Sequence, residues 1–205
     1  MSTAEQLSQE RAKPATYADL EAVPSHLVAE IIDGELVTHP RPVPKHAYAA
    51  NALGSEITDG FQRGRSGPGG WMFLIEPELH FSAEVVVPDI AGWRRPRQPS
   101  FEEAFIKDAP DWVCEVLSPS TERYDRGAKR GIYAEAGVKH MWFLDPRAEM
   151  LETFSLADGK WLVGPTFDND TPVSAAPFDA ISFPLTILWP LDAAPQTPDD
   201  TQNAQ

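Results

Sequence analysis

The stretch PDWVCEVL, residues 110–117, is an apolar strand that carries one carboxylate, Glu115, near its end. A strand of this composition is expected to be buried. Burial of an ionised carboxylate is costly unless a partner charge or a metal compensates it. About 25 residues earlier, the stretch VVVPDIA (85–91) repeats the pattern with Asp89. Two such acids on neighbouring strands would form a site of hard oxygen ligands.

Composition limits the classes to which the protein can belong. The chain has 205 residues, of which 42% are hydrophobic and 23% charged. We predict one domain over residues 15–190, with disordered tails at 1–14 and 191–205. No apolar run reaches the ~20 residues of a membrane span. The single Cys114 excludes an intrachain disulfide, and together these features favour a cytoplasmic protein with no membrane association.

The charge balance is acidic, with a formal net charge of −14. This argues against broad nonspecific attraction to nucleic acid or anionic membrane. However, basic residues gather in two segments that each follow one of the two acid-bearing strands. They are Arg94, Arg95 and Arg97, then Arg123, Arg126, Lys129 and Arg130. Charge alone leaves open whether they form solvated faces or line a groove.

The remaining pattern predicts alternating strands and helices. A short helix is expected at 16–23 with Thr16 as its N-cap, and Asp33-Gly34 predicts a hairpin over 29–37. A helix is expected over 45–62, and two strands over 71–81 and 85–93. Residues 96–109 should be a linker with one helical turn near 101–105. Beyond 117 we expect a helix at 121–136 stopped by Gly137, a strand at 139–144, a hairpin around Asp158-Gly159 and an edge segment at 181–188.

The strand–helix–strand unit over 111–144 implies a right-handed parallel crossover. The predicted fold is therefore a mixed sheet with two main helices, in the α/β or α+β class. In the helix at 121–136, the row containing Tyr124, Ala128 and Ile132 should face the sheet. Lys129 then lies on the adjacent row with Asp125 and Tyr133, at the edge of the buried face.

Asp89 and Glu115 are the candidate ligands for Mg²⁺ or Mn²⁺, with the backbone oxygen of Val116 as a further donor. Hydrolysis of a phosphodiester also needs a cation near the nucleophilic water or the developing charge. Lys129 is the candidate for that cation. Glu30, in the apolar strand before Asp33-Gly34, is another acid expected to be buried.

Each candidate has a simpler interpretation. Asp89 could cap a turn, Glu115 could pair with an arginine, and Glu30 could be a structural acid. Lys129 could form an ordinary surface ion pair with Asp125. His46 is interpreted as a helix-terminus or surface residue, and Tyr133 and Cys114 as packing residues. Ser118 and Ser120 have no visible base in the sequence, so a serine hydrolase is rejected.

Together these residues closely resemble the Uma family of restriction endonucleases, within the PD-(D/E)XK nuclease superfamily. The resemblance covers about residues 16–190. It rests on EIIDGE (30–35), PDI (88–90), EVLSPST (115–121), the spacing Asp125-x-x-x-Lys129-x-x-x-Tyr133, and GVxxxWFLDP (137–146).

The resemblance implies a restriction-endonuclease-like core, a mixed sheet flanked by helices. It also implies roles for residues: Asp89 and Glu115 as the two metal-binding acids, Glu30 as an additional acid, and Lys129 as the catalytic lysine. The superfamily's lysine normally lies two residues after the second acid, where this chain has Leu117. The lysine is thus displaced onto the following helix.

The first hypothesis is a Mg²⁺-dependent endonuclease that hydrolyses phosphodiester bonds, with DNA as the expected partner. The second is a non-catalytic binding or assembly module that keeps the nuclease fold. RNA and smaller phosphodiesters are not distinguished from DNA by the sequence. The tryptophans Trp71, Trp93 and Trp161 could serve a homodimer interface or the core.

Overall fold

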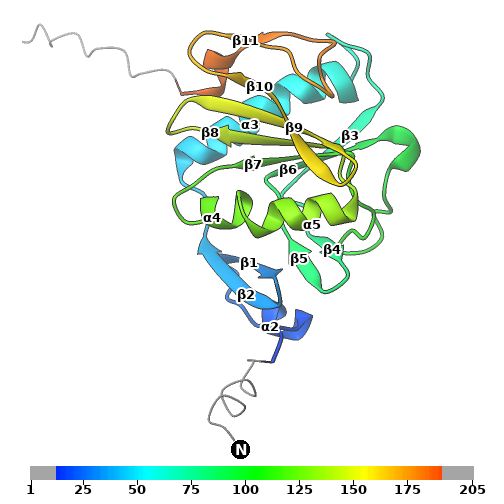
Figure 1. Ribbon diagram of the computed structural model, residues 1–205, viewed down its shortest axis with the longest axis vertical. Coiled ribbons are helices and arrows are strands. Elements are labelled where there is room, and N and C mark those ends of the chain that lie inside the picture. Colours follow the sequence, from blue (N-terminus) through cyan, green and yellow to red (C-terminus); the bar gives the residue numbers. More distant parts are fainter. Residues whose placement is uncertain (1–12, 191–205) are drawn as a thin grey trace, which may run out of the picture.

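The computed structural model describes residues 13–190, so both predicted tails lie almost wholly outside it. Within this range the strands form a six-stranded sheet, a four-stranded sheet and a two-stranded pair. Helix α3 (Pro44–Ile57) packs on one face of the six-stranded sheet, and α4 (Glu122–Asp125) and α5 (Ala128–Ala136) on the other (Figure 1). No helix in the described part is long and apolar enough to cross a membrane. The fold is mixed α+β, as predicted.

The N-terminal elements follow their sequence signals closely. Helix α2 (Tyr17–Glu21) begins with Thr16, whose hydroxyl accepts from the Asp19 N–H while the Asp19 carboxylate accepts from the Thr16 N–H. Strands β1 (Leu27–Ile32) and β2 (Glu35–Pro40) form the predicted hairpin, with Asp33 and Gly34 at positive φ. This hairpin belongs to the four-stranded sheet, whose order is β2-β1-β5-β4.

The two long strands predicted over 71–81 and 85–93 are each divided between the two sheets. Strands β3 (Trp71–Ile75) and β6 (Ile90–Arg94) pair in the six-stranded sheet, whereas β4 (Leu79–Phe81) and β5 (Glu84–Val86) pair in the four-stranded sheet. Pro77 and Pro88 lie at the two breaks, where a residue without an N–H cannot continue a ladder. The prediction of uninterrupted strands was wrong, and the division is what brings the second sheet next to the first.

The parallel crossover is confirmed, since β7 (Trp112–Val116) pairs in parallel with β8 (His140–Asp145). The six-stranded sheet has the order β10-β9-β8-β7-β6-β3. Side chains of β7 alternate: Trp112, Cys114 and Val116 pack with α3, while Val113 and Leu117 pack on the α5 side. Glu115 shares the α5 side by this alternation.

The predicted helix over 121–136 is broken into α4 and α5 at Gly127. A Cβ at this glycine would lie 2.6 Å from the carbonyl oxygen of Arg123, so the turn requires glycine. Gly137 ends α5 in the left-handed conformation, as predicted. Tyr124, Ala128 and Ile132 pack against the core as expected. The adjacent row of Asp125, Lys129 and Tyr133, expected at the edge of the buried face, is buried more deeply still.

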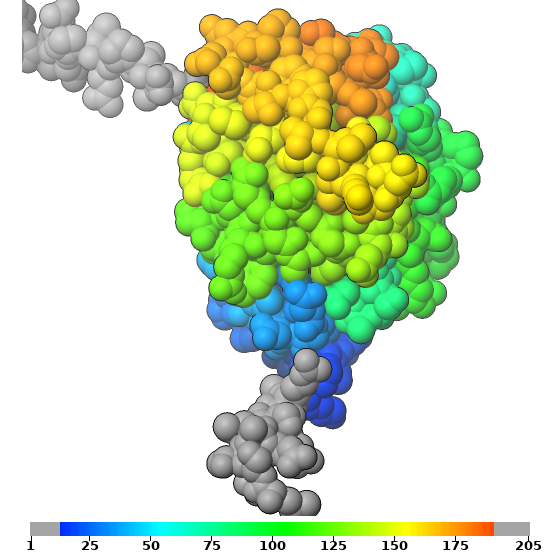
Figure 2. All heavy atoms as spheres, viewed as in Figure 1, coloured from blue at the N-terminus to red at the C-terminus, as the bar shows by residue number. Residues whose placement is uncertain are grey.

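The remaining elements complete the surface. Helix α3 continues into a π-helical turn at Thr58–Gln62, and a 3₁₀ turn at Arg95–Arg97 replaces the helical turn expected near 101–105. Strands β9 (Met150–Ala157) and β10 (Lys160–Phe167) form the predicted hairpin, whose tip (yellow) packs over α5 in Figure 2. The predicted edge segment instead forms β12 (Phe183–Pro184), paired with β11 (Pro172–Val173), and a 3₁₀ turn at Leu185–Leu188. Trp71 and Trp93 are core residues, and Trp161 is partly buried against the hydrophobic core.

Candidate active site

Asp89 and Glu115 lie side by side because their strands are neighbours. Asp89 directly precedes β6, and the antiparallel register pairs Ile90 with Cys114, next to Glu115 on β7. The backbone N–H of Val116 donates to Asp89 Oδ2 at 2.7 Å. The two acids predicted to be adjacent are therefore joined through the backbone of β7, and both line one pocket.

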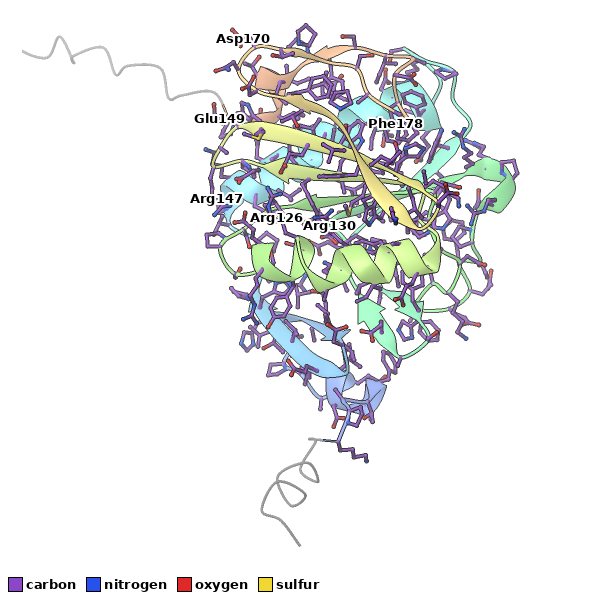
Figure 3. The ribbon with its side chains drawn as sticks, viewed as in Figure 1. Arg126, Arg130, Arg147, Glu149, Asp170 and Phe178 are labelled. Carbon is purple, nitrogen blue, oxygen red and sulfur yellow. The ribbon has the colours of Figure 1, made fainter. Side chains whose placement is uncertain are left out.

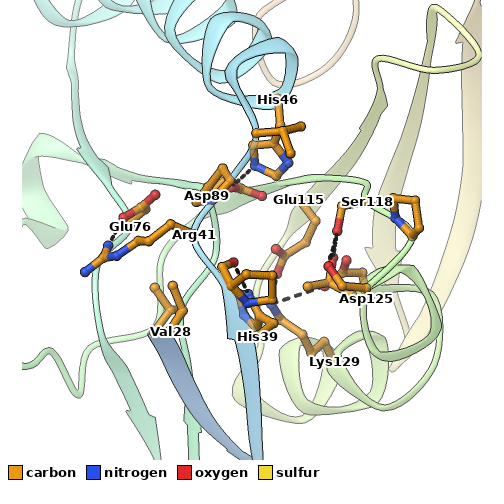
Figure 4. Close-up of a pocket in the computed structure, with 17 residues that line it drawn as sticks. Val28, His39, Arg41, His46, Glu76, Asp89, Glu115, Ser118, Asp125 and Lys129 are labelled. Carbon is orange, nitrogen blue, oxygen red and sulfur yellow. Dashed lines mark hydrogen bonds and ion pairs between the residues drawn. The ribbon is translucent and has the colours of Figure 1, made fainter. Parts of the chain in front are cut away.

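Lys129 reaches this point from α5 and is almost fully buried, with 2% of its side chain exposed. Its Nζ lies 2.8 Å from Glu115 Oε1, 3.0 Å from Glu30 Oε1 and 3.3 Å from Asp125 Oδ1. The pair with Asp125 expected from the sequence exists, but it is buried rather than on the surface. Lys129 is the centre of a cluster of three carboxylates, of which Figure 4 labels Glu115 and Asp125.

Glu30 comes from the other sheet, and the β1–β2 hairpin delivers it. Its Oε1 accepts from the Val87 N–H at 2.8 Å, and its Oε2 lies 3.5 Å from His39 Nε2. Burial alone would raise the pKa of Glu30, but Lys129, His39 and the Val87 N–H outweigh burial and lower it to about 2. Glu30 is therefore an anion that binds Lys129 across the boundary between the sheets.

Two residues of this cluster were assigned other roles from the sequence. Tyr133, interpreted as a packing residue, donates its hydroxyl to Glu115 Oε1 at 2.5 Å. Asp125, considered only as a surface partner of Lys129, is 2% exposed. The signal that could have found both is the four-residue spacing of Asp125, Lys129 and Tyr133, once the break at Gly127 turns that row inward.

His46 was interpreted as a helix-terminus or surface residue, and it is at the helix terminus but not on the surface. It lies in the first turn of α3 but is 8% exposed, and its Nε2 lies 2.6 Å from Asp89 Oδ1. Its Nδ1 is buried and has no hydrogen-bond partner among the described residues. With Val116 bound to the other oxygen, both oxygens of Asp89 are held. No local sequence pattern links residues 46 and 89, so this contact could only come from the tertiary structure.

The electrostatics of the cluster are dominated by an excess of carboxylates. Burial raises the pKa of Glu115 and of Asp125, and Lys129 only partly opposes this. Burial would lower the pKa of Lys129, but Glu115 and Glu30 raise it well above its usual range, so the ammonium stays charged. One ammonium contacts three carboxyl groups, and Asp89 lies next to Glu115, so the acidic side chains outnumber the lysine.

The pocket around the cluster has a volume of about 210 Å³. Its walls come from the end of β2 and the start of α3, the segment before β6, and the Ser118–Thr121 turn after β7. The Ser118 hydroxyl bonds only to Ser120 and Thr121 in the described structure, which agrees with the rejection of a serine nucleophile. Asp89, Glu115 and Lys129 all face the pocket (Figure 4).

The donor chemistry fits a hard divalent cation with few protein ligands. Across residues 13–190 no group of three or more His, Cys, Asp or Glu side chains is arranged to hold a metal. Asp89 and Glu115 supply two carboxylates at most. Mg²⁺ is commonly bound by one or two carboxylates and keeps several waters, so a two-carboxylate site suits it.

The two basic segments do not form a basic groove at the pocket. Arg97 pairs with Asp111, Arg126 with Glu122 and Glu152, and Arg94 lies over the Trp71 ring at 4.6 Å. Of these basic residues, only Lys129 lines the pocket. The basic charge noticed in the sequence is thus mostly used in structural pairs.

The structure thus combines a mixed sheet between helices with two acids on adjacent strands and a lysine beside them. One solved structure shares this fold, with a TM-score of 0.70 and 22% sequence identity. The matched region spans 85% of this chain and 97% of the chain in that structure. The structure is described as "a putative nuclease belonging to DUF820" from Anabaena variabilis ATCC 29413. The comparison with curated proteins gives no match.

The family model Uma2, described as "Putative restriction endonuclease", matches residues 14–187. The chain therefore belongs to the Uma2 family, as the sequence resemblance indicated. Family membership supports a nuclease function for the chain. The individual roles of Glu30, Asp89, Glu115 and Lys129 stay predictions, although all four lie together.

Proposed function

We propose that the protein is a metal-dependent endonuclease that hydrolyses phosphodiester bonds in DNA. The observation that carries the proposal is the contact of one buried lysine with Glu115 and Glu30, beside Asp89 at the wall of a pocket. A purely structural ion pair would need only one carboxylate for the one ammonium. Here the acids outnumber the lysine, and two of them face a space that a phosphate group can enter.

Asp89 and Glu115 would hold Mg²⁺ or Mn²⁺. When bound, the metal would supply Lewis-acid stabilisation of phosphate charge and an activated water. The chain's own groups prepare the two acids. His46 and the Val116 N–H orient Asp89 through its two oxygens, and Tyr133 orients Glu115.

Lys129 would orient the attacking water or stabilise the charge that develops on the phosphate. Glu30 and Asp125 hold its ammonium against Glu115. Because Glu30 is also fixed by the Val87 N–H, the position of the ammonium does not depend on a single flexible side chain. These contacts would hold the ammonium at the site even though the lysine comes from the helix and not from residue 117.

DNA is proposed as the substrate because the family is described as a restriction endonuclease. The net charge of −14 predicts that binding depends on local contacts at the pocket rather than on a broad basic surface. Binding of this kind should be selective and should weaken only modestly with salt, because few phosphates are neutralised.

The test is plasmid cleavage with Mg²⁺ or Mn²⁺, comparing the wild type, the Asp89→Ala/Glu115→Ala double variant and Glu149→Ala. Glu149 is an exposed acid outside the pocket and serves as the control. We expect nicking or linearisation by the wild type and by Glu149→Ala, and none by the double variant. Identical behaviour of all three proteins would contradict the proposal.

The second candidate is a non-catalytic binding module that keeps the nuclease fold. The observation that favours it is the closed state of the cluster: Lys129 contacts three carboxylates, and both Asp89 oxygens are already hydrogen-bonded. Calorimetric titration with Mn²⁺ separates the two functions. Binding that Glu115→Gln abolishes supports the nuclease, whereas an absence of binding by the wild type supports the module.

A further inference from the structure

A second cavity adjoins the active-site pocket and runs between α3 and the edge strand β3. Its volume is about 340 Å³. The two cavities share lining residues, so one opens directly beside the other. The shared residues are Pro42, His46, Glu76 and Asp89. We call the second cavity the α3 groove.

The α3 groove exists because the helix presents small side chains to it. Ala47, Ala50 and Gly54 line it at three- and four-residue spacing, and so form one face of α3. A Cβ at Gly54 would lie 3.6 Å from Ile75 Cδ1, in contact with the opposite wall. That wall is apolar, formed by Phe73 and by Ile75, whose side chain is 58% exposed. An exposed isoleucine facing a hollow offers a surface against which a planar ring can pack.

Polar groups lie along the rim at the end away from the active site. Asn51 and Arg63 are exposed, and Thr58 lies between them in sequence. Within residues 13–190 Arg63 takes part in no ion pair, in contrast to Arg65, whose Nη1 lies 3.8 Å from Asp59. At the other end, the wall shared with the active site contains His46, whose buried Nδ1 has no partner among the described residues. The groove therefore offers an apolar wall, an amide and a guanidinium that has no ion-pair partner within residues 13–190, next to the active site.

We propose that the α3 groove binds one unpaired nucleotide next to the scissile phosphate. The base packs against Phe73 and Ile75, Asn51 contacts its edge, and Arg63 binds the next phosphate along the strand. Amide side chains pair with base edges, and guanidinium groups bind phosphate, in many nucleic-acid complexes. This inference rests on the proposed nuclease function, and it specifies the form of the substrate.

The size of the groove decides between an unpaired nucleotide and a duplex. About 340 Å³ lies at the lower end of the roughly 300–1,000 Å³ typical of small-ligand cavities. A cavity of this size encloses one nucleotide, and a double helix would have to remain outside it. The protein should consequently prefer single-stranded or locally opened DNA to a fully paired duplex.

The experiment fills the groove and follows two substrates of different size. Asn51→Trp places a large ring at an exposed position on the groove, and Arg63→Glu reverses the free charge. Each is assayed with a single-stranded oligonucleotide and with methyl p-nitrophenyl phosphate, whose single ring is on the leaving group and which has neither a base edge for Asn51 nor a second phosphate for Arg63. We expect the ratio of kcat/KM values, oligonucleotide over small ester, to fall at least about tenfold in both variants.

Matched controls carry the same changes far from the groove. Lys160→Trp and Lys160→Glu alter an exposed residue on β10, at the opposite edge of the six-stranded sheet from β3. They should keep the wild-type ratio. An unchanged ratio in both groove variants would overturn the proposal, and so would an equal loss on both substrates.

Failure of the proposed function gives a different result. If the wild type hydrolyses neither substrate, fluorescence anisotropy with a labelled oligonucleotide in EDTA still tests the groove. Weaker binding by Arg63→Glu and Asn51→Trp than by the Lys160 controls then supports the groove without catalysis. Equal binding by all five proteins overturns it.

Discussion

Two groups of charged side chains each join the α4–α5 segment to neighbouring strands, and they differ chiefly in burial. The buried cluster consists of Glu30, Glu115, Asp125 and Lys129, with side chains 2–3% exposed. The surface network consists of Glu122, Arg126, Asp145, Arg147 and Glu152, with side chains 12–44% exposed. Figure 3 shows Arg126 and Arg147 of the surface network near one end of the sheet.

The comparison shows how little a charge pattern says without burial. Glu122 with Arg126 and Asp125 with Lys129 have the same four-residue spacing, and both pairs form. The surface network balances three acids with two arginines and is open to solvent, so each contact contributes little. In the buried cluster three acids face one ammonium away from water, where removal of one partner has large consequences.

The largest expected effect is that of Lys129→Met. The change leaves Glu30, Glu115 and Asp125 buried without their cation, and we expect a loss of about 3–5 kcal/mol in the free energy of unfolding. Guanidinium denaturation in EDTA measures it, with Lys160→Met as an exposed control. A loss below about 1 kcal/mol would mean that the buried cluster contributes no more to the free energy of unfolding than a surface ion pair does.

His46→Ala tests the support of Asp89. The change removes the group that binds one Asp89 oxygen, so we expect Mn²⁺ affinity to fall about 10–100-fold, the usual range for residues that orient a metal ligand. His46→Gln, which can still donate a hydrogen bond, should recover part of this loss. Calorimetry measures both. Equal affinity in wild type and His46→Ala would show that the Val116 N–H alone fixes Asp89.

Gly127→Ala tests the turn that directs Lys129 inward. The new Cβ would lie 2.6 Å from the Arg123 carbonyl oxygen, so the backbone must shift, and we expect a loss of about 1–3 kcal/mol in unfolding free energy. Gly131→Ala is the matched control, because a Cβ there meets nothing within 4 Å. If the two variants are equally stable, the break between α4 and α5 does not depend on glycine.

The same glycine marks the limit of what the sequence predicts. Turn and cap signals are local, and Asp33-Gly34, Thr16 with Asp19, and Gly137 all gave the right elements. Helical periodicity over 121–136 assumed one straight helix, and it placed Lys129 at the edge of the buried face rather than within it. Nothing in the local pattern reports that a Cβ at residue 127 would collide with a carbonyl four residues earlier.

The residues of the site also divide into those that a local sequence signal reveals and those that only the tertiary structure reveals. An acid within an apolar strand is a strong local signal, and it correctly brought Glu30, Asp89 and Glu115 to attention. Tyr133 and His46 were assigned to ordinary packing or surface roles, because their partners Glu115 and Asp89 come from distant elements. Asp125 was paired with Lys129, but the pair was placed on the surface. His46 meets Asp89 across 43 residues of sequence. Contacts of this kind depend on how α3 packs on the sheet, which periodicity does not specify.

A pH series on His39→Gln separates the edge of the buried cluster from its centre. The hydrogen bond to Glu30 raises the pKa of His39, together with the Glu30 charge and the Pro40 carbonyl, against burial and the Lys129 charge. A raised folded-state pKa gives stabilisation that is fully present below the unfolded pKa of about 6.5 and is lost as pH rises through the folded pKa. The stability advantage of wild type over His39→Gln should therefore shrink as the pH rises above about 6.5 and through the folded-state pKa of His39. A constant advantage would mean that His39 stays neutral and contributes only through packing.

The smallest expected effect is that of Arg147→Ala in the surface network. Arg147 is 44% exposed and contacts Glu122 at 2.7 Å and Asp145 at 2.9 Å, and Glu122 keeps Arg126 as a partner when it is removed. We expect a loss of less than about 1 kcal/mol in unfolding free energy, which should diminish further in about 1 M NaCl. The loss caused by Lys129→Met should largely persist at that salt concentration, because salt screens side chains that are only 2–3% exposed much less than exposed ones. A loss for Arg147→Ala that is equally insensitive to salt would show that the surface network is shielded from dissolved ions like the buried cluster. Side-chain exposure would then not be what separates the two groups.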